Sequence, residues 1–259
     1  MALTEQIHTF ENGLMLFDRH LTPQQRARYR AKNLHEPEEE EIFLSAIRSL
    51  PTGGLFASVG TAIGYYAILA AKTRPDLEIH CFDPHPKHVV YMGENFELNG
   101  LGDLGIQIHQ IAVSDRSGMV NFLDNSFASS VADISHWRFL INRMRGILSG
   151  RFMGHAPVAR FQVPAKTLCD AIKLIARSSV DLLQMDIQGH ECAVLMDFFK
   201  HNKKEKKHVQ EFLIGTHGQS IHFSCRELFL ENGYALLADS PICDTQPDGI
   251  LHSRYTHLS

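Results

Sequence analysis

The sequence predicts an α/β fold with a mostly parallel central sheet. From residue 55 onward, short apolar segments typical of strands alternate with longer segments typical of helices. Turn and cap residues such as Asn99 and Gly100 separate these segments. The length of 259 residues and the 44% hydrophobic content are sufficient for one large domain with a complete core. We therefore expect a single sheet with helices on both faces.

Residues 1–50 are expected to form a helical extension, and residues 51–259 the α/β domain. Thr22 followed by Pro23 is a typical helix start, and a second proline, Pro37, is followed by a run of glutamates that the helix dipole favours. The extension could serve as a lid, as a dimer arm or as packing for the domain.

Within the domain, strands and helices are predicted in strict alternation. Strands are expected at 55–59, 78–83, 106–115, 118–124, 180–187, 209–217 and 234–240, with an antiparallel edge strand at 249–258. Helices are expected at 64–74, 86–100, 167–176, 190–201 and 224–233.

An arginine-rich insert at about 124–165 interrupts the alternation. It contains the only tryptophan, Trp137, and residues 125–160 hold five arginines against one acid, Asp133. Long segments of this kind are often lids or binding loops, and arginine suits an anionic ligand through bidentate pairing. The alternative is an amphipathic helix that covers the sheet.

Composition excludes several classes of function. The net charge of −4 gives no signal for nucleic acid or an anionic membrane, which select a strongly basic face. Five cysteines without a CxxC pair indicate reduced thiols. The sequence has neither a leader peptide pattern nor 18 consecutive apolar residues, so we expect a soluble, cytoplasmic protein.

A glycine turn follows the first predicted strand of the domain. Gly60 and Gly64 would let the backbone approach a ligand at the start of a helix. Asp83 ends the next strand, about 20 residues further on, where an acid commonly binds ribose hydroxyls. A dinucleotide fingerprint would need glycines where Ala62 and Tyr65 stand, so a nucleoside without a pyrophosphate is the better fit.

Seven segments occur in the order seen in FkbM-type S-adenosylmethionine-dependent methyltransferases, and the chain resembles this family over roughly residues 55–239. They are ASVGTAIGYYAILAA, IHCFDPHP, ENFELNGL, IAVSDRSG, KTLCDAI, VDLLQMDIQGHECAVL and ENGY. The family patterns include VDIGANIGYYS, DLIKIDVEGxE and a strand near IEIH. The resemblance implies a Rossmann-like class I methyltransferase fold, with a mostly parallel seven-stranded sheet that ends in an antiparallel hairpin.

The resemblance also implies the cofactor, S-adenosylmethionine, and the residues that bind it. The glycine turn would face the methionine portion, Asp83 the ribose, and the segment after the third strand the adenine. The cofactor-binding residues expected in this way are Ser58, Gly60, Thr61, Gly64, Tyr65, Asp83, Ala112, Val113, Ser114 and Asp186.

Four positions depart from the family patterns. Ser58 replaces an aspartate, Ala62 an asparagine and Gln188 a glutamate, while Gly215 stands where the IEIH strand has its acid. Serine accepts a hydrogen bond but supplies no charge for the cofactor's ammonium group. These changes favour the alternative of a catalytically inactive methyltransferase-fold protein that binds a nucleoside or a protein partner.

Methyl transfer to a hydroxyl needs a base for the departing proton. His217, at the end of a strand, is the candidate base, with Asp186 and Glu191 as further catalytic candidates and His190 expected to be exposed. No metal-binding motif is present, so we expect no metal, although Asp186 with Glu191 or His217 could hold a divalent ion.

Together these features predict O-methylation of a hydroxyl on a sugar or a natural-product-type small molecule. The expected partners are this acceptor, which is anionic or sugar-containing, and a second copy of the chain in a homodimer.

Overall fold

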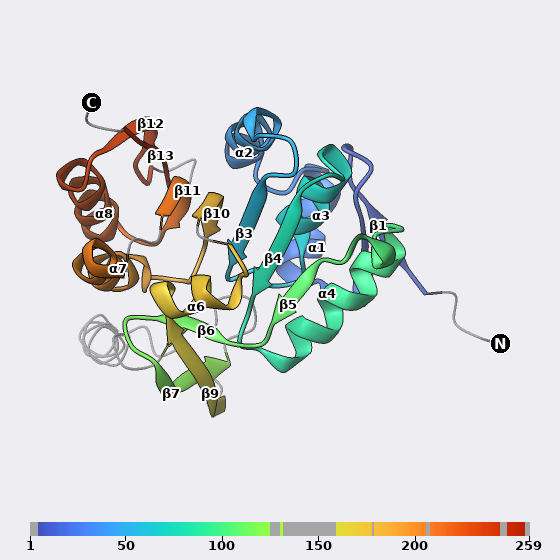
Figure 1. Ribbon diagram of the computed structural model, residues 1–259. Coiled ribbons are helices and arrows are strands. Elements are labelled where there is room, and N and C mark those ends of the chain that lie inside the picture. The colour runs from blue at the N-terminus through green and yellow to red at the C-terminus, as the bar shows by residue number, and fades with distance from the viewer. Residues whose placement is uncertain are drawn as a thin grey trace, which may run out of the picture.

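The computed structural model describes residues 5–124, 130–131, 159–177, 179–205, 208–243 and 248–256. A twisted central sheet carries helices on both faces, as the sequence predicts (Figure 1). The seven strands of this sheet, from one edge to the other, are β12 (Tyr234–Ser240), β13 (Gly249–Tyr255), β11 (His208–Thr216), β10 (Ser179–Met185), β3 (Leu55–Val59), β4 (Glu78–Phe82) and β5 (Gln107–His109).

Strands β12 and β13 form the antiparallel hairpin, which pairs with β11 through β13, and the other five strands are parallel to one another. The expectation that 249–258 forms an edge strand is wrong, because β13 lies between β11 and β12 and the edge is β12. The reason is visible in its apolar side chains: Ile250 is buried in the core on one face of the sheet and Leu251 in the core on the other. A strand buried on both faces belongs inside a sheet.

The strand order reverses between β3 and β10. Strands β4 and β5 follow β3 on one side, toward one edge of the sheet. Strands β10 and β11, which come later in the chain, lie on the other side of β3. Ligands of open α/β sheets bind at the carboxyl ends of the strands at such a switch point. Ser58 pairs directly with Gln184 across it, so the ends of both strands lie at the same level.

Two layers of helices enclose the sheet (Figure 1). Each layer packs its own cluster of buried apolar side chains against one face. One layer contains α1 (Pro23–Ala31), α2 (Pro37–Ser49), α3 (Tyr65–Thr73) and α4 (Pro86–Leu98), and the other α6 (Leu168–Leu174), α7 (Glu191–Glu205) and α8 (Gln219–Glu231). Single 3-10 turns are found at Asp18–His20 and Gly102–Leu104.

The N-terminal segment is only partly helical. Strands β1 (Ile7–Thr9) and β2 (Met15–Phe17) pair as a hairpin, so the prediction of helix is wrong over this part of residues 1–50. Gly13 has a φ of +77° in the turn, which suits a hairpin and not a helix. Leu14 and Leu16 are fully buried, in the same core cluster as Phe56 of β3. The segment is thus packed against the domain and adds to its core.

A smaller sheet lies beside the main one. The predicted strand 106–115 is in fact two strands in two sheets, because the chain turns at Ile111 between β5 and β6. The order in the small sheet is β6 (Ala112–Ser114), β9 (Ala159–Thr167), β7 (Gly118–Asp124) and β8 (Ser130–Val131). Most of the arginine-rich insert, including Trp137, lies outside the described residues.

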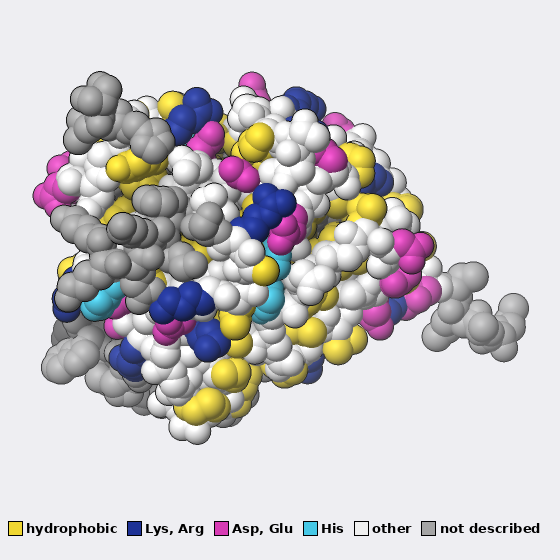
Figure 2. All heavy atoms as spheres, in the orientation of Figure 1, with side chains coloured by type: hydrophobic (Ala, Val, Ile, Leu, Met, Phe, Trp, Pro, Cys, Tyr) yellow, Lys and Arg dark blue, Asp and Glu magenta, His cyan; other side chains and the backbone are white. Residues whose placement is uncertain are grey.

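Positive and negative side chains are intermixed on the face that Figure 2 shows, which agrees with the small net charge. In the part of the chain that the structure describes, no helix combines the length and the apolar composition that a bilayer crossing needs.

Candidate active site

The turn after β3 brings two backbones into close contact. Gly60 has a φ of +79°, and a Cβ on this residue would lie 1.9 Å from the carbonyl oxygen of Asp186. Only glycine fits such an approach. The amide nitrogens of Gly60 and Thr61 donate to the carbonyl oxygen of Phe82, at 2.8 and 3.3 Å. The turn is therefore fixed between the ends of β4 and β10.

A crevice opens at this point, with about 520 Å³ of space that is partly open to solvent. Its walls come mainly from the carboxyl ends of β3, β4 and β10 and from β6. Five of the expected cofactor residues line it: Gly60, Asp83, Ala112, Val113 and Asp186. The other lining residues are Val59, Ala62, Phe82, Pro84, His88, Phe122, Ile187, Gln188 and His190.

Asp83, which directly follows β4, connects the end of that strand to the glycine turn. Its Oδ2 atom accepts a hydrogen bond from the Ala62 amide at 2.9 Å, and its Oδ1 atom accepts one from the His85 amide at 2.9 Å. The Nδ1 atom of His88 lies 3.0 Å from Oδ1. A carboxylate has about four acceptor positions, so Asp83 is fixed in place and retains capacity for a ligand hydroxyl.

The other expected cofactor residues do not line the crevice. Gly64 begins α3, where a Cβ would lie 2.8 Å from the Phe96 ring, so it allows α3 to pack on α4. The Tyr65 hydroxyl points toward the N-terminal segment and donates to Glu40 at 2.8 Å. Thr61 donates to the Ser58 carbonyl, and Ser114 lies 3.1 Å from Nε2 of His190. Their contact with a cofactor stays a prediction.

Ser58 is buried in the sheet beneath the crevice. Its hydroxyl donates to Oε1 of Gln184 at 2.8 Å, and the two residues are direct partners on β3 and β10. The pair is neutral, so it places no charge in the interior of the sheet at this point.

Ala62 has a φ of +51°, in the left-handed region that disfavours residues with a Cβ. Asparagine, which the FkbM pattern has here, tolerates this conformation better than alanine. Gln188 also has a positive φ, +56°, and its side-chain amide donates to Oδ1 of Asp186 at 3.1 Å. Both residues thus adopt the left-handed backbone conformation where they line the crevice.

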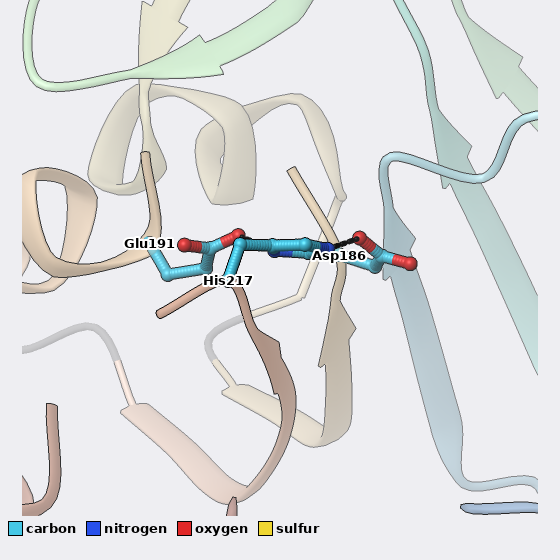
Figure 3. Close-up of side chains that lie close together, drawn as sticks. All are labelled: Asp186, Glu191 and His217. Atoms are coloured by element: carbon cyan, nitrogen blue, oxygen red, sulfur yellow. Dashed lines mark hydrogen bonds and ion pairs between the residues drawn. The ribbon is translucent and has the colours of Figure 1, made fainter. Parts of the chain in front are cut away.

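The three catalytic candidates lie together (Figure 3), and Asp186 is the one of them that lines the crevice. Asp186 follows β10, Glu191 begins α7 and His217 follows β11, so the His217 ring lies between the two carboxylates. Nδ1 of His217 is 2.8 Å from Oε1 of Glu191, and its Nε2 is 3.3 Å from Oδ1 of Asp186 and 3.6 Å from Oδ1 of Asp248. Glu191 is fully buried and also accepts from the Gly189 amide at 2.9 Å.

The charges of these groups depend on one another. Burial lowers the pKa of His217, but the hydrogen bond with Glu191 and the charge of Asp186 outweigh it and raise the pKa to about 9. Burial raises the pKa of Asp186 to about 7, against the opposing charge of His217. At neutral pH, without a ligand, His217 is therefore an imidazolium held by Glu191.

The same groups have the chemistry of a metal site. One ligand atom each from Asp186, Glu191 and His217 lie within 4.8 Å of one another. Nitrogen and carboxylate oxygen ligands of this kind suit a divalent transition metal. This set of ligands is the divalent-ion alternative that the sequence allows beside the expectation of no metal.

Sequence reasoning missed several residues of the site. His190 was expected to be exposed, but it is buried at 4% exposure because its ring packs against Ser114 of β6, 76 residues away. His88 lies in the first turn of α4, five residues after Asp83, and no regular spacing predicts the 3.0 Å approach of its Nδ1 atom to Oδ1 of Asp83. Asp248 lies beyond the motifs of the family and gave no signal.

The sequence and the fold match known methyltransferases. The family model of the methyltransferase FkbM domain matches residues 58–235. The 2-O-methyltransferase NoeI of Sinorhizobium fredii is 27% identical over 181 residues, which cover 66% of this chain and 69% of that protein. The ribosomal RNA small subunit methyltransferase G of Beutenbergia cavernae is 27% identical over 139 residues, 52% of this chain. That match spans 64% of the relative, slightly less than two thirds.

A solved structure of a human methyltransferase 10 domain containing protein has the same fold. It aligns with a TM-score of 0.50 and 12% identity, over 84% of this chain and 81% of that one. The expected class I methyltransferase fold is therefore confirmed, and with it S-adenosylmethionine as the cofactor of such an enzyme. The family model covers well over half of the chain, and the chain belongs to the FkbM methyltransferase family.

Proposed function

We propose that this methyltransferase methylates a hydroxyl oxygen of a small molecule, with a sugar as the first choice of acceptor. The observation that carries the proposal is the His217 ring, which Glu191 holds through Nδ1 and whose Nε2 lies beside Asp186, a residue that lines the crevice. A base held by a carboxylate in this way can take a proton from an acceptor hydroxyl. The relative NoeI, named a 2-O-methyltransferase, supports oxygen as the atom methylated.

The residues of the crevice fit the cofactor. Gly60 leaves room for a ligand against the backbone, and Asp83 offers an anchored carboxylate for the two ribose hydroxyls. Ala112 and Val113 supply an apolar wall for the adenine. When bound, S-adenosylmethionine supplies a methyl group on a positively charged sulfur, and the carboxylate of Asp186 would favour that charge electrostatically.

His217 has three tasks in this proposal. It aligns the acceptor hydroxyl, accepts its proton at Nε2, and passes from imidazole to imidazolium while Glu191 balances the new charge. Because its pKa is raised to about 9, only a small fraction is the neutral base at pH 7. A cationic cofactor beside Asp186 would lower this pKa and increase that fraction.

The charge of the site favours a neutral acceptor. Asp186 and Asp248 both lie within 3.6 Å of Nε2 of His217, so an anion would be repelled at this place. The anionic acceptor that the arginine-rich insert suggested depends on residues outside the described ranges. We therefore place neutral sugars ahead of phosphorylated or carboxylated ones.

Methyl transfer from labelled S-adenosylmethionine tests the proposal. The acceptor panel would contain neutral sugars, glycosylated natural products, sugar phosphates and ribosomal RNA. We expect label in a neutral hydroxyl compound, stable to the mild alkali that hydrolyses methyl esters. Label in RNA would contradict the small-molecule acceptor. Cofactor binding without transfer to any acceptor would favour an inactive, nucleoside-binding relative.

A further inference from the structure

The crevice has to receive a cofactor whose methionine portion carries an ammonium group. Ser58, which stands where the FkbM pattern has an aspartate, is fully buried, donates to Gln184 and is not among the residues that line the crevice. Of the described residues that do line it, Asp83 and Asp186 are acidic and none is a lysine or an arginine. A positively charged ligand group is therefore favoured beside Asp186, and it also needs oxygen atoms that accept its hydrogen bonds.

Gln188 combines an accessible side chain with a strained backbone. It lines the crevice and is partly exposed to solvent. Among the described residues other than glycine, only Gln188 and Ala62 have a positive φ, and both line the crevice. Glycine would adopt the φ of +56° without strain, so the turn by itself does not require a long side chain at this position. Backbone strain of this kind is concentrated at functional sites.

The hydrogen bond of the Gln188 side chain determines which of its atoms is left for a ligand. Nε2 donates to Oδ1 of Asp186 at 3.1 Å, and within the described part of the chain this is the only hydrogen bond of the side chain. An ionised carboxylate only accepts, so the amide nitrogen faces Asp186 and the carbonyl oxygen Oε1 keeps two acceptor positions. The same Oδ1 atom lies 3.3 Å from Nε2 of His217, so the amide and the imidazole meet at one carboxylate oxygen.

Gln188 lies on the side of the crevice where the methionine portion is expected. A Cβ on Gly60 would lie 1.9 Å from the carbonyl oxygen of Asp186 and 3.1 Å from Cγ2 of Ile187, so the chain that leads to Gln188 runs directly along the glycine turn. This turn is the part of the site that would face the methionine portion. The α-ammonium of that portion has three N–H donors, whereas the sulfonium has none. An amide oxygen next to a carboxylate therefore fits the ammonium.

We infer that Gln188 is a cofactor-binding residue, whose Oε1 accepts a hydrogen bond from the α-ammonium of S-adenosylmethionine while Asp186 supplies the opposing charge. This inference rests on the part of the proposed function that places the cofactor in this crevice, and it is independent of the acceptor. The ammonium then lies at the end of β10, and not at the buried position of Ser58.

The test compares S-adenosylhomocysteine with its deaminated analogue, which lacks only the ammonium group, by calorimetric titration of the full chain. Gln188→Gly removes the amide and the strain, whereas Gln188→Met removes the amide and keeps the side-chain length. Gln107→Met is the matched control, at an exposed glutamine of β5 that does not line the crevice. In both Gln188 variants we expect the affinity for S-adenosylhomocysteine to fall about tenfold to a hundredfold, the range of a hydrogen bond to a charged group. The affinity for the deaminated analogue should stay unchanged, and Gln107→Met should change neither.

Equal weakening of both ligands in the Gln188 variants would overturn the inference, because it would indicate that the residue only shapes the crevice. Unchanged affinity for both ligands would overturn it as well. A crystal structure of the parent chain with S-adenosylhomocysteine separates direct contact from an effect through Asp186. We expect Oε1 of Gln188 at about 3 Å from the ammonium nitrogen. An ammonium group that contacts Asp186 alone would overturn the assignment.

The failure of the proposed function gives a different result. Selective loss of S-adenosylhomocysteine in a chain that transfers no methyl group would support the inference and contradict the proposed methylation. Failure of the parent chain to bind either ligand would overturn the placement of the cofactor and this inference together. Thermal melting controls for folding, because Gln188→Gly relieves the left-handed conformation and should melt close to the parent chain.

Discussion

Nδ1 of His217 lies 2.8 Å from Oε1 of Glu191, a carboxylate with no exposure to solvent. The two residues come from different elements, the end of β11 and the start of α7. Their contact fixes the imidazole so that Nε2 faces Asp186 at the crevice. Because of this contact, His217 is the candidate base of the site.

Replacing the base should abolish most of the activity. We expect His217→Gln to reduce the rate of methyl transfer by about 10²- to 10⁴-fold, the usual contribution of general base catalysis. Cofactor affinity should stay within a few-fold. His201→Gln is the matched control, because His201 also pairs with a carboxylate, Asp197, at 2.9 Å but lies away from the crevice. Equal rates in both variants would rule out His217 as the base.

The pH profile should report the His217–Glu191 pair. Since the pKa of His217 is raised to about 9, the rate should increase with pH from neutrality toward that value. Glu191→Gln removes the charge that raises the pKa, so the rising limb should move to lower pH by at least about one unit. NMR titration of the His217 ring in both proteins checks the assignment. An unshifted ring pKa would contradict it.

Stability should fall as the solution becomes alkaline. The pKa of His217 in the folded chain, about 9, lies above the ordinary 6.5, so its contribution is complete below about pH 6.5 and is lost as pH rises through 9. The loss amounts to at most about 3 kcal/mol of unfolding free energy. Burial raises the pKa of Asp186 to about 7, so this residue also makes the free energy of unfolding fall as the pH rises from about 4 to 7. Urea unfolding of His217→Gln should show a smaller decline above pH 6.5 than the parent chain.

The turn at Ala62 offers a test of the backbone. Because Ala62 has a φ of +51°, Ala62→Asn should raise the unfolding free energy by about 1 kcal/mol. Ala62→Val should lower it, since a β-branched residue fits the left-handed region worst. Thermal unfolding of the two variants beside the parent chain measures both effects. Destabilisation by asparagine would show that the turn does not hold this conformation.

The sequence was sufficient to predict those parts of the fold that local pattern and family motif both determine. The strand, glycine turn and helix around Gly60 occur in the predicted order, and Gly60, Asp83 and Asp186 line the crevice at the switch point. His217 follows the next strand, β11, and contacts Asp186. These residues each follow a strongly apolar strand of the parallel part of the sheet. Because parallel strands end at the same edge of a sheet, the strand pattern alone predicts that these residues lie close together.

Other features depend on contacts that no local pattern reveals. The hairpin of β1 and β2 has strands of only three residues, too short for a periodic signal. The side chain of Tyr65 faces the N-terminal segment and not the crevice, because its partners Asn12 and Glu40 lie far away in the sequence. The run of glutamates at the start of α2 also has buried members: Glu39 and Glu40 are each only 6% exposed, and no local pattern predicts this.

The most direct test of the central claim, a cofactor site between Gly60, Asp83 and Asp186, is calorimetric titration with S-adenosylmethionine and with NAD as the control ligand. The parent chain should bind S-adenosylmethionine in the micromolar range and NAD at least a hundredfold more weakly. Asp83→Asn should weaken S-adenosylmethionine by at least about tenfold, because it replaces a charged acceptor for ribose hydroxyls with a neutral one. Absence of binding up to millimolar concentration, or equal affinity in the parent and the Asp83→Asn variant, would contradict the assignment of this crevice.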